Sequence, residues 1–151
     1  MYEFILELHN IFRWIVLVLA LIAVITAFIG GIGKREWTKR DKQIGTFYTI
    51  SMDIQLLLGL ILYLFFSEFG LKAIRYQGMS YVMSEGGRET MFFAVEHIFI
   101  MVVAVVFAHL GSILAQKAPE SKGKFKRAAI FFTLSLLTLL VGIPWWRPLF
   151  F

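Results

Sequence analysis

The sequence contains no cysteine, only three prolines and few charged residues. Without cysteine the chain forms no disulfide, holds no zinc or iron–sulfur cluster through thiolates, and attaches no haem through a Cys-x-x-Cys-His motif. Any cofactor must be held by histidine, methionine, carboxylates or packing. Charged residues make up 17% of the chain and hydrophobic residues 59%, with a mean hydropathy of +0.76. This balance excludes a water-soluble domain with a solvated surface.

Three polar gaps divide the chain into four apolar stretches, residues 11–33, 44–66, 91–116 and 128–145. At about 1.5 Å per residue, each reaches roughly 27 to 39 Å as a helix, against a hydrocarbon core of roughly 30 Å. Helices are expected because backbone polar groups in lipid must be satisfied within their own segment. We therefore predict an all-α integral membrane protein. Its single transmembrane domain, residues 1–151, is an antiparallel four-helix transmembrane bundle with helices at about 8–33, 44–66, 91–116 and 128–145.

The connection between the second and third predicted helices is the longest polar segment of the chain. It mixes apolar and charged side chains, and we expect a short interfacial helix there that ends at Gly86 and Gly87. Small residues inside the predicted helices should allow close helix approach: Gly59, Ala104, Ala108 and Gly111.

Basic residues are distributed unevenly between the gaps. Ten of the fifteen lysines and arginines lie in the gaps after the first and third stretches, residues 34–43 and 117–127. The positive-inside rule places these two loops in the cytoplasm, so both termini face the periplasm or the cell exterior. We predict a multi-pass protein of the bacterial inner (plasma) membrane. The net charge of +5 gives no indication of nucleic-acid binding, because it is concentrated in these loops.

Ionisable side chains within the hydrocarbon zone are expensive and usually functional. The candidates are His9, Arg13, Asp53, Glu96, His97 and His109. Counted from the nearest polar boundary, His9 and His97 lie at similar depths on the outer side. Two imidazoles on different helices provide the axial ligation that a b-type haem needs. We therefore predict His9 and His97 as metal ligands for haem b.

Two arginines are predicted to help bind this cofactor. Arg13 follows His9 by four residues and lies on the same helical face. Together with Arg147 or Arg88, it could neutralise the haem propionates at the outer interface. Alternatives remain open: Arg13 snorkelling beside Trp14, and structural roles for the two histidines.

Asp53 and His109 lie at similar depths from the inner side. We predict that they hydrogen-bond each other, either as a buried structural pair or as a proton relay. Glu96 points about 100° away from His97 on the helix, so it does not ligate the same metal but could take protons in quinone chemistry. Asp53, His109 and Glu96 are thus the catalytic candidates, with quinone as a substrate.

Four segments carry a resemblance to a known family: LHNIFRW, DIQLLLGLILY, VEHIFIM and IPWWRP. They resemble the small four-helix bacterial membrane proteins described as cytochrome b-like, over nearly the whole chain. The resemblance implies haem and electron transfer. In relatives, a histidine often precedes the Gln-Leu-Leu stretch, where this chain has Asp53, so the resemblance gives no haem ligand in the second helix.

The leading hypothesis is a b-type haem protein that transfers electrons or oxidises quinol at the outer face, a membrane oxidoreductase. The rival hypothesis is a haem-free transporter, metal-handling protein or membrane-complex subunit that uses the buried His, Asp and Glu residues. The partners considered are the lipid bilayer, quinol, a redox protein and a second copy of the chain. Motifs of soluble enzymes, such as His-Glu-x-x-His and Gly-x-Ser-x-Gly, do not occur.

Overall fold

A computed structural model describes residues 1–147, and within that range every regular element is helical. Four segments are long and apolar enough to cross a membrane. Their main helices are α1 (Tyr2–Ile32), α2 (Lys39–Ile61), α6 (His97–Lys117) and α7 (Ser121–Gly142). A π-helical turn, η1 (Leu62–Phe66), continues α2, and another, η3 (Phe92–Glu96), leads into α6. The fold class predicted from the apolar stretches is therefore confirmed at the level of an all-helical chain with four such segments.

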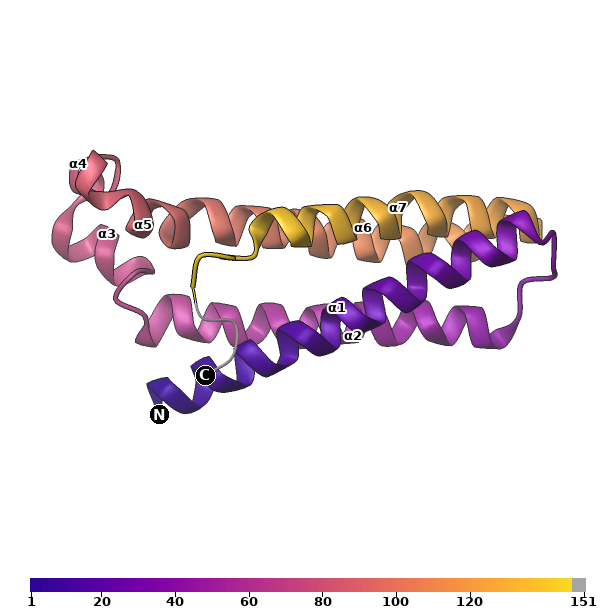
Figure 1. Cartoon of the computed structure of the whole chain (residues 1–151), viewed down its shortest axis with the longest axis horizontal. Helices are drawn as coiled ribbons and strands as arrows, with labels where there is room; N and C mark the ends of the chain where they lie inside the picture. The colour runs from indigo at the N-terminus through magenta and orange to yellow at the C-terminus, as the bar shows by residue number, and fades with distance from the viewer. Residues whose placement is uncertain (148–151) are drawn as a thin grey trace.

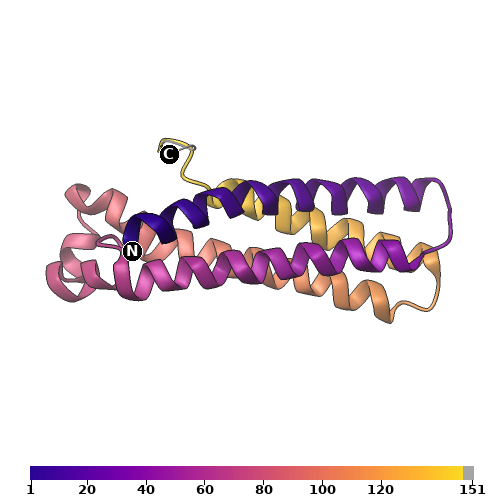
Figure 2. The ribbon, with the colours of Figure 1, turned by 90° about the horizontal axis from the view of Figure 1, so that it is seen from below.

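The four long helices lie side by side (Figures 1 and 2). The chain reverses direction at one end between α1 and α2 and between α6 and α7, and at the other end through short elements. These elements are α3 (Leu71–Gln77), α4 (Met79–Val82), η2 (Glu85–Gly87) and α5 (Arg88–Met91). Helix α1 packs against α2 and α7, and α6 packs against α2 and α7. The N-terminus lies at the same end as α3, α4 and α5.

Proline sets the ends of α6 and α7. A residue that precedes proline is pushed out of the helical region into an extended conformation. Ala118, before Pro119, has a ψ of 137° and follows the last residue of α6. Ile143, before Pro144, has a ψ of 129° and follows the last residue of α7. The fourth helix thus ends three residues before the predicted position 145.

The helices are longer at their polar ends than the apolar pattern indicated. Helix α1 begins at Tyr2 instead of position 8, α2 at Lys39 instead of 44, and α7 at Ser121 instead of 128. Hydropathy marks the apolar part of a helix, whereas the backbone hydrogen bonds continue into the polar sequence on either side. The predicted single interfacial helix is also wrong in detail. The segment divides into α3 and α4 at Gly78, whose φ of 79° favours glycine, and Gly86 and Gly87 lie in η2.

Small side chains occupy the contacts between the long helices, as the sequence predicted. Ala104 and Ala108 of α6 are fully buried, and so are Ala20 and Ala23 of α1. A Cβ atom at Gly111 would lie 2.7 Å from the Phe132 ring, so only glycine fits between α6 and α7 there. In the absence of a hydrophobic driving force between helices in lipid, such close packing is a main source of helix association.

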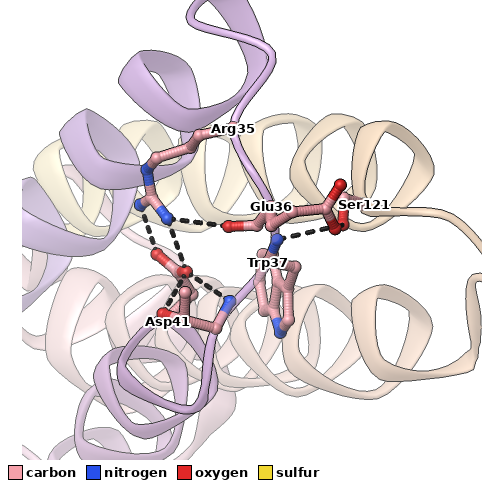
Figure 3. Close-up of polar contacts among 6 residues, drawn as sticks. Arg35, Glu36, Trp37, Asp41 and Ser121 are labelled. Atoms are coloured by element: carbon pink, nitrogen blue, oxygen red, sulfur yellow. Dashed lines mark hydrogen bonds and ion pairs between the residues drawn. The ribbon is translucent and has the colours of Figure 1, made fainter.

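Polar contacts hold the α1–α2 loop against the start of α7 (Figure 3). The Arg35 guanidinium donates to both Asp41 oxygens, at 2.7 and 2.5 Å, which raises the pKa of Arg35 above its ordinary value. Asp41 also accepts from the Thr38 backbone N–H at 2.8 Å, at the start of α2. Across the loop, Ser121 accepts from the Trp37 N–H at 3.0 Å and donates to Glu36 at 2.7 Å.

Removal of the Asp41 carboxylate should destabilise the fold. Asp41 is only 4% exposed and accepts four hydrogen bonds from Arg35 and Thr38. We expect Asp41→Ala to lower the free energy of unfolding by about 2 kcal/mol, because it removes charge-assisted bonds and a helix cap together. Unfolding in mixed micelles, followed by circular dichroism, measures this. Lys42→Ala, at the exposed neighbouring residue, should change it by less than about 0.5 kcal/mol; equal effects would contradict the prediction.

Candidate functional site

A cavity of about 330 Å³ lies among the long helices, toward the end where α3, α4 and α5 are found. Its size falls at the lower end of the range of about 300 to 1,000 Å³ that is usual for ligand sites. Most of its lining is apolar. Its polar and charged lining residues include His9, Asn10, Arg13, Gln55, His97 and Arg147. Among residues 1–147 no carboxylate lines it, and the buried Arg13 contributes a positive charge, so the cavity favours a ligand with an apolar body and an acidic group.

His9 of α1 and His97 of α6 meet across this cavity, as the sequence predicted. Their ring centroids are 6.4 Å apart and the ring planes cross at 70°. Two metal–nitrogen bonds of about 2 Å each require ring nitrogens about 4 Å apart on opposite sides of a metal. A centroid separation of 6.4 Å is compatible with that requirement. Both side chains face the interior and neither points to the outer surface of the bundle.

The orientation of the His97 ring is set by the end of α7. Its Nδ1 lies 2.7 Å from the carbonyl oxygen of Gly142, the last residue of α7. The last carbonyls of a helix have no partner within the helix, and a carbonyl only accepts hydrogen bonds. Nδ1 therefore carries the proton and donates it to Gly142. In the neutral ring this leaves the Nε2 lone pair available to a metal, as in most histidine ligands.

His9 is held by α2. The Gln55 amide nitrogen donates to the His9 carbonyl oxygen at 3.0 Å and lies 3.3 Å from its ring Nε2. The other ring nitrogen, Nδ1, is buried and has no hydrogen-bond partner within residues 1–147. A Cβ atom at Gly59 would lie 3.2 Å from the His9 Cε1. Glycine at this position thus makes room for the imidazole, a different role from the close helix approach predicted for it.

Both predicted propionate partners line the cavity. Arg13 is buried, with 9% exposure, and its guanidinium lies over the Trp14 ring, 5.7 Å from the ring centroid. The contact with Trp14 that the snorkelling alternative expects is therefore present, although the side chain does not reach the surface. Arg147 forms an ion pair with Glu89 at 2.7 Å and stacks on the rings of Phe69 and Phe93 at 4.7 and 4.4 Å. Its charge is therefore already compensated, and its contacts hold the segment after α7 over the cavity. Residues 148–151, which follow Arg147, lie outside the described residues.

The predicted hydrogen bond between Asp53 and His109 is confirmed, because His109 Nε2 lies 2.8 Å from Asp53 Oδ1. The predicted burial of this pair is wrong. Its side chains are 52% and 41% exposed, on the outer surface of α2 and α6. Glu96, the third catalytic candidate, is also exposed and does not line the cavity. The three catalytic candidates therefore do not share a site with His9 and His97.

Two features of the cavity gave no recognisable signal in the sequence. The π-helical turn η3 ends at Glu96, directly before His97, and η1 carries Tyr63 in the cavity wall. Tyr63 links the two turns by donating to the Ala94 carbonyl oxygen at 3.1 Å. Single π-helical turns occur frequently at functional sites. Both arise from a local change in backbone hydrogen bonding, which an uninterrupted apolar run does not reveal.

No group of three or more His, Cys, Asp or Glu side chains within residues 1–147 is placed to hold a metal ion. A haem iron needs only two ligands from the protein, since the macrocycle supplies the other four. Comparison with protein-family models, with curated proteins and with solved structures found no match to this chain.

Proposed function

We propose that this chain is a multi-pass protein of the bacterial inner membrane, folded as an antiparallel four-helix transmembrane bundle with periplasmic termini. The support is the length and apolar character of four helical segments and the placement of ten basic residues in or near the two loops at one end. The His9–His97 cavity then lies toward the periplasmic side.

Within this bundle we propose a b-type haem, with His9 and His97 as its axial ligands and electron transfer as its function. The observation that carries this proposal is the pair of inward-facing imidazoles 6.4 Å apart. The residues present fit the group in three respects. His97 presents Nε2 because its Nδ1 donates to the Gly142 carbonyl, His9 has a buried nitrogen without a hydrogen-bond partner within residues 1–147, and the buried Arg13 lines the same cavity.

A bound haem supplies one-electron redox chemistry at a potential that its axial ligands and surroundings set. The chain's own residues have separate tasks. His97 is oriented by Gly142, His9 is positioned by Gln55, and the buried Arg13 provides positive charge for an acidic substituent. Most of the remaining lining is apolar. A quinol is the electron donor that we favour, because it dissolves in the surrounding bilayer.

The optical spectrum of the purified protein tests this proposal. The chain is expressed with a haem precursor in the medium, purified in detergent and reduced with dithionite. We expect a Soret band, sharp α and β bands, and one haem per chain. A colourless protein under these conditions would contradict haem binding. Elemental analysis of the same sample distinguishes the rival function, because a stoichiometric transition metal other than iron would favour haem-free metal handling.

A further inference from the structure

The Asp53–His109 pair lies on the outer surface of the molecule, far from both ends of its helices. Asp53 lies about 20 Å from the start of α2 and about 20 Å from the end of η1, at about 1.5 Å per residue. Its side chain is 52% exposed, and that of His109 is 41% exposed. In the transmembrane arrangement proposed above, these polar groups would face hydrocarbon at mid-depth. Such groups almost always face a protein partner or a water-filled space.

Further polar residues extend this pair into a stripe. On α2 they are Thr46, Thr49 and Asp53, and on α6 they are His109, Ser112 and Gln116. Thr49 is only 7% exposed, so the α2 part of the stripe reaches the outer surface mainly through Asp53 and the half-buried Thr46. Both sets have the spacing i, i+3, i+7, which places each set on one helical face. The two faces adjoin, because a Cβ atom at Gly45 would lie 3.8 Å from the Ser112 hydroxyl. We call these six residues the polar seam.

We propose that the polar seam is the interface of a homodimer within the membrane. Its two-fold axis runs along the membrane normal and sets Asp53 of each copy against His109 of the other. The argument is charge complementarity. Asp53 of α2 and His109 of α6 lie side by side at the same height. A rotation of 180° about that axis places α2 of the second copy opposite α6 of the first, so the carboxylate of each copy faces the imidazole of the other. Asp53 and His109, which already bond each other within one chain at 2.8 Å, would then alternate with the same two residues of the second copy.

The rest of the seam suits the same partner. Serine, threonine and glutamine hydrogen-bond across helices in lipid, and small side chains allow helices to approach closely. Thr46 and Gln116 of the seam donate to backbone carbonyls of their own helices, and their side-chain oxygens remain able to accept hydrogen bonds from a second copy. The inference rests on the membrane arrangement of the proposed function, but it is independent of haem.

The absence of cysteine makes the interface accessible to disulfide cross-linking. Two chains with different affinity tags are co-expressed, one with Ile50→Cys and the other with Ile113→Cys. These residues are 48% and 45% exposed on α2 and α6. In the proposed dimer they would flank the seam and face each other across the two-fold axis, because Ile50 is three residues from Asp53 and Ile113 is four residues from His109. The matched control pair is Ile25→Cys with Leu137→Cys, on α1 and α7, with similar exposures of 53% and 54%. Membranes are oxidised with copper phenanthroline.

We expect the seam pair to give a cross-linked product that carries both tags, at about ten times the yield of the control pair. Equal yields, or a product that contains a different protein, would overturn the homodimer. Carbonate extraction of the same membranes separates this failure from failure of the proposed membrane insertion. A chain that remains in the membrane without cross-linking contradicts only the dimer, whereas a chain released by carbonate contradicts both.

Charge exchange provides a second test in the seam cross-linking background. A chain with Asp53→His presents two imidazoles, and a chain with His109→Asp presents two carboxylates. When both tagged chains carry the same substitution, the cross-linking yield should fall about tenfold. When one tagged chain carries Asp53→His and the other His109→Asp, the yield should recover. Each chain carries the same substitution in both experiments, so a recovered cross-linking yield cannot come from better folding of either chain. If both chains are inserted in the membrane and the yield does not recover, the self-complementary arrangement is overturned.

Discussion

Replacement of His97 by glycine should abolish haem binding while leaving the helices in place. The substitution removes one of two axial ligands and opens space beside the His9 ring, which lies 6.4 Å away. Loss of a side chain that only supports a metal ligand typically lowers metal affinity by about 10- to 100-fold. Loss of the ligand itself should cost more, so we expect haem content to fall by at least about 100-fold. Absorbance at the Soret band, relative to protein concentration, measures the loss.

Two controls separate loss of the ligand from loss of the fold. Imidazole in the growth medium and buffers should restore the Soret band to His97→Gly, because it can take the place of the missing side chain. His109→Gly removes the histidine on the outer surface of α6 and should keep its full haem content. If His97→Gly retained haem, or if both variants lost it equally, the assignment of His97 as a ligand would fail.

Gly59→Leu should also reduce haem content strongly, although residue 59 supplies no ligand. A Cβ atom added at residue 59 would lie 3.2 Å from the His9 Cε1, so the larger branched side chain of leucine must displace the imidazole. A ligand that is 1 Å out of place no longer meets its metal, and we expect a decrease of about tenfold or more. Gly59→Ala should have a smaller effect, because the His9 ring has to move by only a few tenths of an ångström.

Leu57→Phe is the matched control for Gly59→Leu. It adds bulk to the same helix, but on the outer surface, where Leu57 is 58% exposed. This variant should bind haem as the unmodified chain does. Circular dichroism of all three variants monitors their helix content. Normal haem content in a well-folded Gly59→Leu protein would show that the His9 ring has no role in binding.

The main features of the cavity could be predicted by counting residues. The depth of His9 and His97 below the polar boundaries placed them in one layer, and the 3.6-residue period placed Arg13 on the same face as His9. These inferences depend only on the rise and periodicity of helices. The contact between Asp53 and His109 followed from the same count and was confirmed at 2.8 Å.

The groups that orient the ligands could not be predicted in this way. Gly142 contacts His97 through a backbone carbonyl, which becomes available because Pro144 ends α7 nearby. Gln55 reaches His9 from a different helix, so that contact depends on how α1 and α2 are rotated against each other. Burial of Asp53 and His109 was predicted wrongly for a related reason. Hydropathy gives the position of a residue along a helix, but it does not distinguish a helix face that packs inside the chain from a face on its outer surface.

The electron paramagnetic resonance spectrum of the oxidised protein tests the central claim most directly. Two imidazole ligands impose a strong axial field on a ferric haem, so we predict a low-spin signal that accounts for one iron per chain. The His97→Gly variant should give no signal from bound haem iron, and the low-spin signal should return when haem and imidazole are supplied together. A high-spin spectrum of the unmodified protein, or the absence of any haem-iron signal, would contradict ligation by His9 and His97.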